Sequence, residues 1–202
     1  MARHQGSPSP SPLLDLVAQL LSSPVCSVCE DHPVLVLGEG SPRARIMFVG
    51  SEPSPFPGPA GELLSRMIEA MGLKQEDVYL ANLRKCTSSS PDPSSLSAEV
   101  STCADLLDRQ IAAIRPEVIV ALGEFAAESL VGEKVGMTHI RGHFKNYRLL
   151  DIPVMPTFHP GHLLEHAASK RDAWEHLKAV AKHLGIEIPV KVPRKPTGVD
   201  PA

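Results

Sequence analysis

Residues 45–82 read RIMFVGSEPSPFPGPAGELLSRMIEAMGLKQEDVYLAN, and this stretch decides the fold. It begins with a short apolar run at 45–50 that is typical of a buried strand. Apolar residues then recur at helical spacing over 61–72, where Gly72 is placed to end the helix. A second apolar run at 78–82 predicts another strand. A strand, a helix and a strand in this order predict a right-handed crossover between two parallel neighbours.

The same alternation continues toward the C-terminus. We expect a helix at 97–114, a strand at 118–122, a helix at 124–131, a strand at 152–158 and a helix at 169–185. This pattern predicts an α/β fold, a three-layer α/β/α sandwich around a central, mostly parallel four-stranded sheet. Ligands of such sheets bind at the carboxyl ends of the strands, so we expect the chemistry in the loops that follow them.

Composition predicts one folded domain and limits the class of partner. The 202 residues are 43% hydrophobic, which is enough for one sizeable core. We expect this domain at 13–187, between a Ser/Pro-rich tail at 1–12 and a Pro-rich tail at 188–202. The formal net charge of -3 gives no overall attraction to DNA, so any contact with nucleic acid must come from a local patch. No apolar run has the length of a signal peptide core or a membrane span, so we expect a cytoplasmic protein without membrane contact.

The four cysteines are candidate metal ligands. Cys26 and Cys29 form a CxxC, and Cys86 and Cys103 follow with sixteen residues between them. Four soft thiolates suit either zinc or an iron-sulfur cluster, and the spacing does not choose between the two. The alternative is a buried CxxC and two unrelated core thiols. The third and fourth cysteines stand in polar, Ser-rich sequence, where a small hydrophobic side chain has little to pack against.

Several motifs occur in a fixed order, namely CSVC, FVGSEPS, PFPGPAGELL, YLANLRKC, the last cysteine and TFHPGHLL. This order resembles the family 4 uracil-DNA glycosylases of base-excision repair, over about residues 26–180. The resemblance implies a uracil-DNA glycosylase-like fold and hydrolysis of the N-glycosidic bond of uracil, or of a related deaminated base, in single- or double-stranded DNA. It also implies a four-iron, four-sulfur (4Fe-4S) cluster on Cys26, Cys29, Cys86 and Cys103. We expect the protein to act as a monomer.

The resemblance implies a base-binding site at the ends of the first two strands. Phe56 would stack on the uracil ring, because an aromatic face is a platform for an extruded base. Asn82 would accept a hydrogen bond from uracil N3–H and donate one to O4, a pattern that cytosine reverses. Gly50 and Ser51 would complete this site. The alternatives are that Phe56 is a core residue and that Asn82 ends a strand in an Asx turn.

His159 would assist the departure of the base. Cleavage leaves an electron-poor sugar and an electron-rich uracil, so a hydrogen bond to uracil O2 stabilises the transition state more than the ground state. A neutral imidazole suffices for this role. Without its motif His159 would be an average member of nine histidines. His139 and His143, which flank Arg141, are expected to face solvent or DNA.

We expect the contacts with DNA to come from local groups. Gly58 and Gly61 precede or begin a helix, whose first N–H groups can face phosphates. His162 and Leu163 occupy the position at which the family inserts a wedge into the duplex. The candidate cations are Arg84, Lys85, Arg141 and Arg171. The alternative for each cation is a solvated surface residue.

The first motif departs from the family pattern. The family reads G-E-x-P-G and then an acidic loop before P-F, whereas this chain passes from GSEPS directly to PF. Glu52 is the carboxylate left nearby, and we expect it to take the catalytic role of that loop. Two alternatives remain open, namely a glycosylase with another lesion preference and a weak or silent iron-sulfur nucleic-acid-binding protein. General-base help typically contributes about 100- to 10,000-fold to a rate, so its loss need not abolish activity.

Overall fold

The computed structural model describes residues 36–51, 58–85, 93–134 and 136–189. The strands along these residues are β1 (Glu39–Gly40), β2 (Ile46–Gly50), β3 (Tyr79–Asn82), β4 (Val118–Leu122), β5 (Lys145–Asn146) and β6 (Pro153–Thr157). The helices are α2 (Pro59–Ala70), η1 (Gln75–Asp77), α3 (Pro93–Ile114), α4 (Glu124–Val131), α5 (Met137–Ile140), α6 (Pro160–Glu165) and α7 (Ser169–His183). The tail expected at 1–12 lies outside the described residues, as does all but the start of the tail expected at 188–202.

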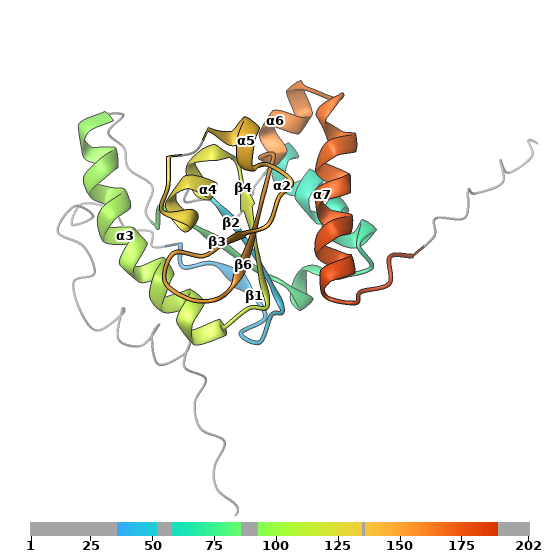
Figure 1. The fold of residues 1–202 in the computed structure, drawn as a ribbon, viewed down its shortest axis with the longest axis horizontal. Coiled ribbons are helices and arrows are strands. Elements are labelled where there is room, and N and C mark those ends of the chain that lie inside the picture. The colour runs from blue at the N-terminus through green and yellow to red at the C-terminus, as the bar shows by residue number, and fades with distance from the viewer. Residues whose placement is uncertain (1–35, 52–57, 86–92, 135, 190–202) are drawn as a thin grey trace, which may run out of the picture.

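The strands form one six-stranded sheet in the order β1-β3-β2-β4-β6-β5 (Figure 1). The four central strands pair in parallel, which confirms the predicted core of the sheet. The expected number of four strands was too small, because β1 and β5 pair antiparallel with β3 and β6 at the two edges. Each edge strand has two residues, too few to produce an alternating pattern in the sequence.

Helices cover both faces of the sheet. Alternate strand residues point to opposite faces, and the apolar core is divided accordingly. Met47 and Val49 belong to a buried cluster with side chains of α3 and α4. Ile46 and Phe48 belong to a second cluster with side chains of α2 and α7. The predicted three-layer α/β/α sandwich is therefore confirmed.

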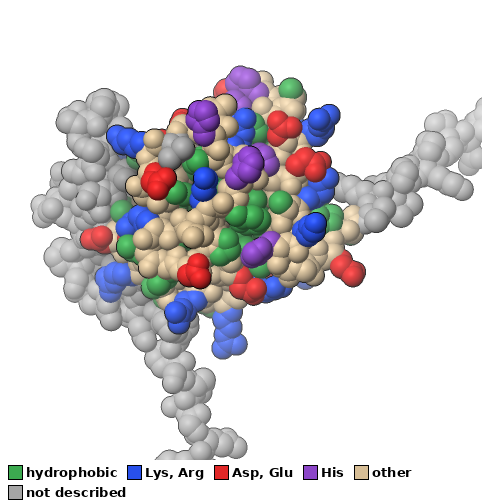
Figure 2. Space-filling view, in the orientation of Figure 1, with side chains coloured by type: hydrophobic (Ala, Val, Ile, Leu, Met, Phe, Trp, Pro, Cys, Tyr) green, Lys and Arg blue, Asp and Glu red, His purple; other side chains and the backbone are tan. Residues whose placement is uncertain are grey.

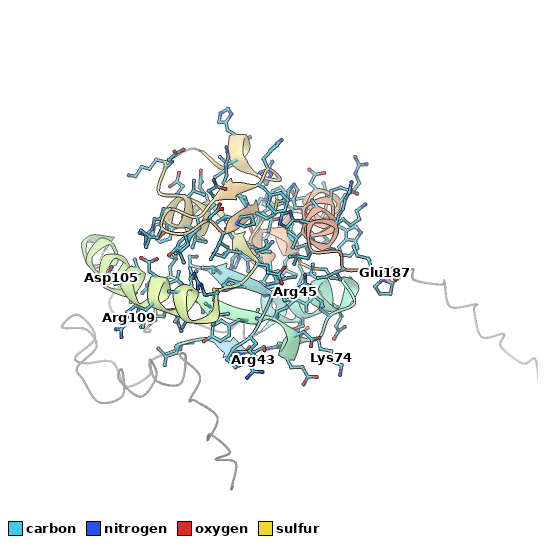
Figure 3. The ribbon with its side chains drawn as sticks, turned by 60° about the horizontal axis from the view of Figure 1, so that its bottom comes forward. Arg43, Arg45, Lys74, Asp105, Arg109 and Glu187 are labelled. Atoms are coloured by element: carbon cyan, nitrogen blue, oxygen red, sulfur yellow. The ribbon has the colours of Figure 1, made fainter. Side chains whose placement is uncertain are left out.

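The two helical layers lie on opposite sides of the molecule in Figure 3. Asp105 and Arg109 mark α3 on one side, and Glu187, just after α7, lies on the other. Arg45 and Glu117 directly precede β2 and β4, and their side chains form an ion pair of 2.5 Å at the amino ends of these strands. None of the helices within the described ranges is both long and apolar enough to cross a bilayer.

We expect Phe48→Ala to lower the free energy of unfolding by about 3–5 kcal/mol, because Phe48 is fully buried and its loss leaves a cavity. Urea unfolding measures the change. The control Glu117→Ala removes the half-exposed ion pair with Arg45 and should cost less than about 1 kcal/mol. A loss in Phe48→Ala no larger than that of the control would contradict this assignment of the core.

Candidate active site

The carboxyl ends of the four parallel strands meet at one edge of the sheet. Gly50 at the end of β2 pairs in register with Asn82 at the end of β3. Leu122 at the end of β4 pairs in register with Thr157 at the end of β6. His159 stands two residues after Thr157, in the loop that follows β6. Asn82 and His159 therefore lie at the same edge of the sheet. Since β2 and β4 lie between β3 and β6, three strand spacings of about 4.8 Å put these two strand backbones roughly 14 Å apart.

Asn82 is held in a buried position at this edge. Its exposed fraction is 2%, so its amide is one of the few polar side chains within the described part of the core. The chain after Asn82 stays paired with the loop after β2, because Leu83 N donates to Gly50 O at 2.9 Å and Arg84 N to Ser51 O at 3.3 Å. The two loops therefore fix the position of the asparagine from both sides.

His159 is held as the N-cap of α6. Its Nδ1 accepts a hydrogen bond from the backbone N–H of Gly161 at 3.1 Å. In a neutral imidazole one nitrogen accepts and the other carries the proton, so this bond leaves the proton on Nε2. Gly123 follows β4 with a φ of 92°, and a Cβ atom added there would lie 3.4 Å from the His159 Cβ. The ring is thus a fixed N–H donor, oriented by its own helix and flanked by the end of β4.

A stack of flat side chains adjoins His159. The Arg141 guanidinium lies 4.1 Å from the centre of the Phe158 ring. The His162 ring is stacked on Phe158 at 5.2 Å, and the His166 ring on His162 at 4.2 Å. Figure 2 shows histidines gathered on the part of the surface formed by α5, α6 and α7. The structure therefore brings the predicted residues Arg141 and His162 together, through Phe158, for which we predicted no role in the site.

His176 supports the end of β6 from helix α7. Its Nδ1 lies 2.9 Å from Thr157 Oγ1, and Thr157 is fully buried. A Cβ atom added at Gly142 would lie 2.6 Å from His176 Nε2, so the glycine is required for this close approach. Burial lowers the pKa of His176, and the nearby Arg141 guanidinium lowers it further. The neutral ring is therefore the form that fits this position.

Two residues expected to contact DNA are buried. Leu163 is 1% exposed and packs with Phe158 and Ala173, so its side chain cannot reach a duplex. The exposed leucine of this turn is its neighbour Leu164, at 41%. Lys85 is also 1% exposed, because its side chain turns into the protein instead of toward solvent. The expectations for Leu163 as a wedge and Lys85 as a phosphate contact are therefore wrong.

The glycines before α2 differ in accessibility. Gly58 is exposed, has a φ of 80° and is the N-cap of the helix. Gly61 is buried within the first turn. Of the two glycines expected at the DNA, the structure therefore presents Gly58 at the surface. Arg84 is partly buried beside Ser51, and Arg171 is exposed on α7.

Several predicted site residues lie outside the described ranges. They are Cys26, Cys29, Glu52, Phe56 and Cys86. The remaining cysteine, Cys103, is buried on α3 with an exposed fraction of 4%. Among the residues that are described, no three His, Cys, Asp or Glu side chains gather as a metal site. The roles of Glu52 and Phe56, and the four-cysteine ligand set, stay predictions.

We expect His176 to make stability depend on pH. Its pKa is lower in the folded protein than in the unfolded chain, so the unfolded chain binds more protons below about pH 6.5. Its contribution to stability is complete above this pH and is lost as the pH falls toward the folded pKa. Urea unfolding at several pH values should show a steeper acid loss for the unmodified protein than for His176→Asn. Parallel curves for the two proteins would contradict the assignment.

Comparison with known proteins identifies the family of this chain. The model of the uracil DNA glycosylase superfamily matches residues 37–178. The chain is 36% identical to the type-4 uracil-DNA glycosylase of Thermotoga maritima over 173 residues, which are 78% of this chain and 86% of the relative. It is 32% identical to the protein of the same name from Archaeoglobus fulgidus over 194 residues, 87% of this chain and 94% of the relative. The chain therefore belongs to the uracil DNA glycosylase superfamily and, within it, to the type-4 uracil-DNA glycosylases.

Proposed function

We propose that this protein hydrolyses the N-glycosidic bond of uracil in DNA, the first step of base-excision repair, and that Asn82 and His159 carry the reaction. Membership of the type-4 family supports the activity. The observation that carries the assignment of residues is the register of the sheet, which brings both residues to one edge. The backbones of β3 and β6 lie roughly 14 Å apart, a gap that two side chains, two hydrogen bonds of about 2.9 Å and one pyrimidine ring can span.

His159 supplies a hydrogen bond to the leaving base. When the glycosidic bond breaks, its electron pair stays with uracil and negative charge grows on O2. The Nε2–H of His159 donates to this oxygen, and Nδ1 is engaged with Gly161 N–H. The donor is in place before the reaction, so no reorganisation is needed as the charge develops. His159 therefore acts by stabilising charge and needs no proton transfer.

Asn82 reads the edge of the base. Its amide oxygen accepts from uracil N3–H, and its amide nitrogen donates to O4. Cytosine presents an acceptor and a donor at the same positions, so both hydrogen bonds would be lost. Because Asn82 is buried, water cannot replace these partners, and the mismatch carries the full desolvation cost. This difference selects uracil against the cytosine from which it arises by deamination.

The remaining parts of the reaction fall to other residues. Phe56 stacks on the extruded ring, and Gly50 and Ser51 border it. Glu52 orients the water that attacks the sugar, in place of the acidic loop that the family carries. A net charge of -3 requires local contact with DNA, for which the exposed Gly58 and the partly exposed Arg141 and His162, both stacked on the buried Phe158 ring, are suited.

We expect loss of either central residue to suppress uracil excision. The assay uses single- and double-stranded oligonucleotides with one uracil, followed by alkaline scission of the product. His159→Asn keeps a side chain suited to the N-cap of α6 but removes the Nε2–H donor, so the rate should fall by about 100- to 1,000-fold. Asn82→Ala should reduce uracil excision at least as strongly.

The control His183→Ala changes an exposed histidine of the last turn of α7 and should leave excision unchanged. Undiminished scission in both Asn82→Ala and His159→Asn would show that the chemistry lies elsewhere. Binding of uracil-containing DNA by the unmodified protein without any scission would favour the alternative of a silent binding protein.

We further propose that Cys26, Cys29, Cys86 and Cys103 hold a 4Fe-4S cluster. The donor set consists of soft thiolates, and four of them leave no open position on the cluster, so its role is structural. The described surroundings of Cys103 fit an anionic group. Cys103 is buried, and whereas burial lowers the pKa of Lys85, negative charge at Cys103 raises it.

Anaerobically purified protein should be brown, with about four iron and four acid-labile sulfide per chain. Cys103→Ser should lose most of this iron and sulfide, because a hydroxyl is a poor substitute for a thiolate ligand. Elemental analysis and the visible absorption spectrum measure both proteins. A colourless preparation that contains zinc would overturn the cluster and replace it with a zinc site.

A further inference from the structure

A ladder of three stacked rings runs along helix α6 from the residue before His159. Phe158, His162 and His166 follow one another at intervals of four residues, so they lie in one row along the helix and its two ends. The Phe158 and His162 ring centres are 5.2 Å apart, with an angle of 3° between the ring planes. The His162 and His166 ring centres are 4.2 Å apart, at 11°. The three ring planes are therefore nearly parallel.

The ladder leads from the interior to the solvent. Phe158 is 9% exposed, His162 is half-buried and His166 is exposed. The inner ring is held, since the Arg141 guanidinium lies 4.1 Å from its centre and the His176 ring 6.1 Å from it. The outer ring is held by the helix backbone, because His166 Nδ1 lies 3.3 Å from His162 O, to which it can only donate. A flat ring of fixed orientation is thus present at the surface.

A nucleobase is a ligand that suits such a ring. Every base has a flat π-face, and its stacking on an aromatic side chain tolerates any sequence. Phe158 directly precedes His159, and only two ring separations lie between Phe158 and His166. This length corresponds to about three nucleotides at the spacing of about 3.4 Å in a stacked strand, and to fewer in an extended strand. A base close to a uracil bound at His159 can therefore reach the ladder.

We propose that His166 is the outer platform of a stacking subsite for an unpaired base near the uracil, and that this subsite favours single-stranded DNA. The inference rests on the proposed function. In a duplex the bases beside the uracil are paired and stacked, so a stack on His166 would first cost these contacts. In a single strand the same bases are unpaired and can be splayed onto a ring. His166 binds the substrate in this role and takes no part in cleavage of the glycosidic bond.

The test compares His166→Asn and His166→Phe with the unmodified full-length protein, on one uracil oligonucleotide as a single strand and as a duplex. Asparagine keeps a donor for His162 O and removes the ring, whereas phenylalanine keeps the flat face and removes the donor. We expect KM for the single strand to rise at least about fivefold in His166→Asn, with kcat unchanged, and to stay within about twofold in His166→Phe. KM for the duplex should stay unchanged in both variants.

A change in the DNA identifies the base that stacks. Each base within about three nucleotides of the uracil, on either side, is replaced in turn by an abasic spacer in the single strand. One of these spacers should raise KM for the unmodified protein and have no further effect in His166→Asn, because both changes remove the same contact. The control His183→Ala removes another exposed histidine, in the last turn of α7, and should match the unmodified protein on every substrate.

Three results overturn the subsite while uracil excision itself stands. They are an equal rise in KM for His166→Asn and His166→Phe, an equal rise for single strand and duplex, and no rise for either. A failure of the unmodified protein to release uracil overturns the proposed function instead, and binding of the same oligonucleotides then tests the subsite. Tighter binding of the single strand that is lost in His166→Asn and kept in His166→Phe supports the subsite, and equal binding by all three proteins overturns it.

Discussion

The parallel register of β3, β2, β4 and β6 is the constraint on which the rest of the structure depends. A slip of one residue would move every strand side chain to the opposite face. Such a slip is costly here, because Met47 and Phe48 are both fully buried, on different faces and under different helices. The two helical layers thus fix the register from both sides. Asn82 and His159 receive their positions at the edge of the sheet from that same constraint.

The polar groups at this edge are held by two kinds of support. Backbone hydrogen bonds fix the loops themselves, as with Gly161 and the ring of His159. Flat side chains then stack beside them, with Arg141 on Phe158 and His162 on the same ring. The Phe158 ring is itself buried, so it supports the partly exposed Arg141 and His162 from below. The side chain of Lys85, by contrast, points into the protein, where its Nζ donates to the Gln110 side chain.

The central layers were predictable from the sequence because their patterns are long and buried. The expected bounds of β4 and α4 agree with the structure residue for residue. The resemblance led to Asn82 and His159, whose common edge follows from the parallel topology.

Burial of individual residues was not predictable in this way. Lys85 is charged and stands in a polar stretch, so exposure was the natural expectation, and its inward turn depends on Gln110, distant in sequence. Leu163 and Leu164 are chemically identical, and packing against Phe158 decides which one is buried.

The two-residue strands β1 and β5 at the edges of the sheet limit its pairing with strands of other molecules. A strand at the open edge of a sheet has unpaired backbone N–H and C=O groups. A strand of a second molecule can pair with these groups, and aggregation follows. Here β1 and β5 cover the two edges, and each is too short to pair along any length with a strand of another molecule. Gly40 in β1 also sits so close to its neighbour that an added Cβ atom would lie 2.0 Å from the carbonyl oxygen of Val78. Along the described residues, the sheet therefore ends at both sides in strands that give another molecule little backbone to pair with.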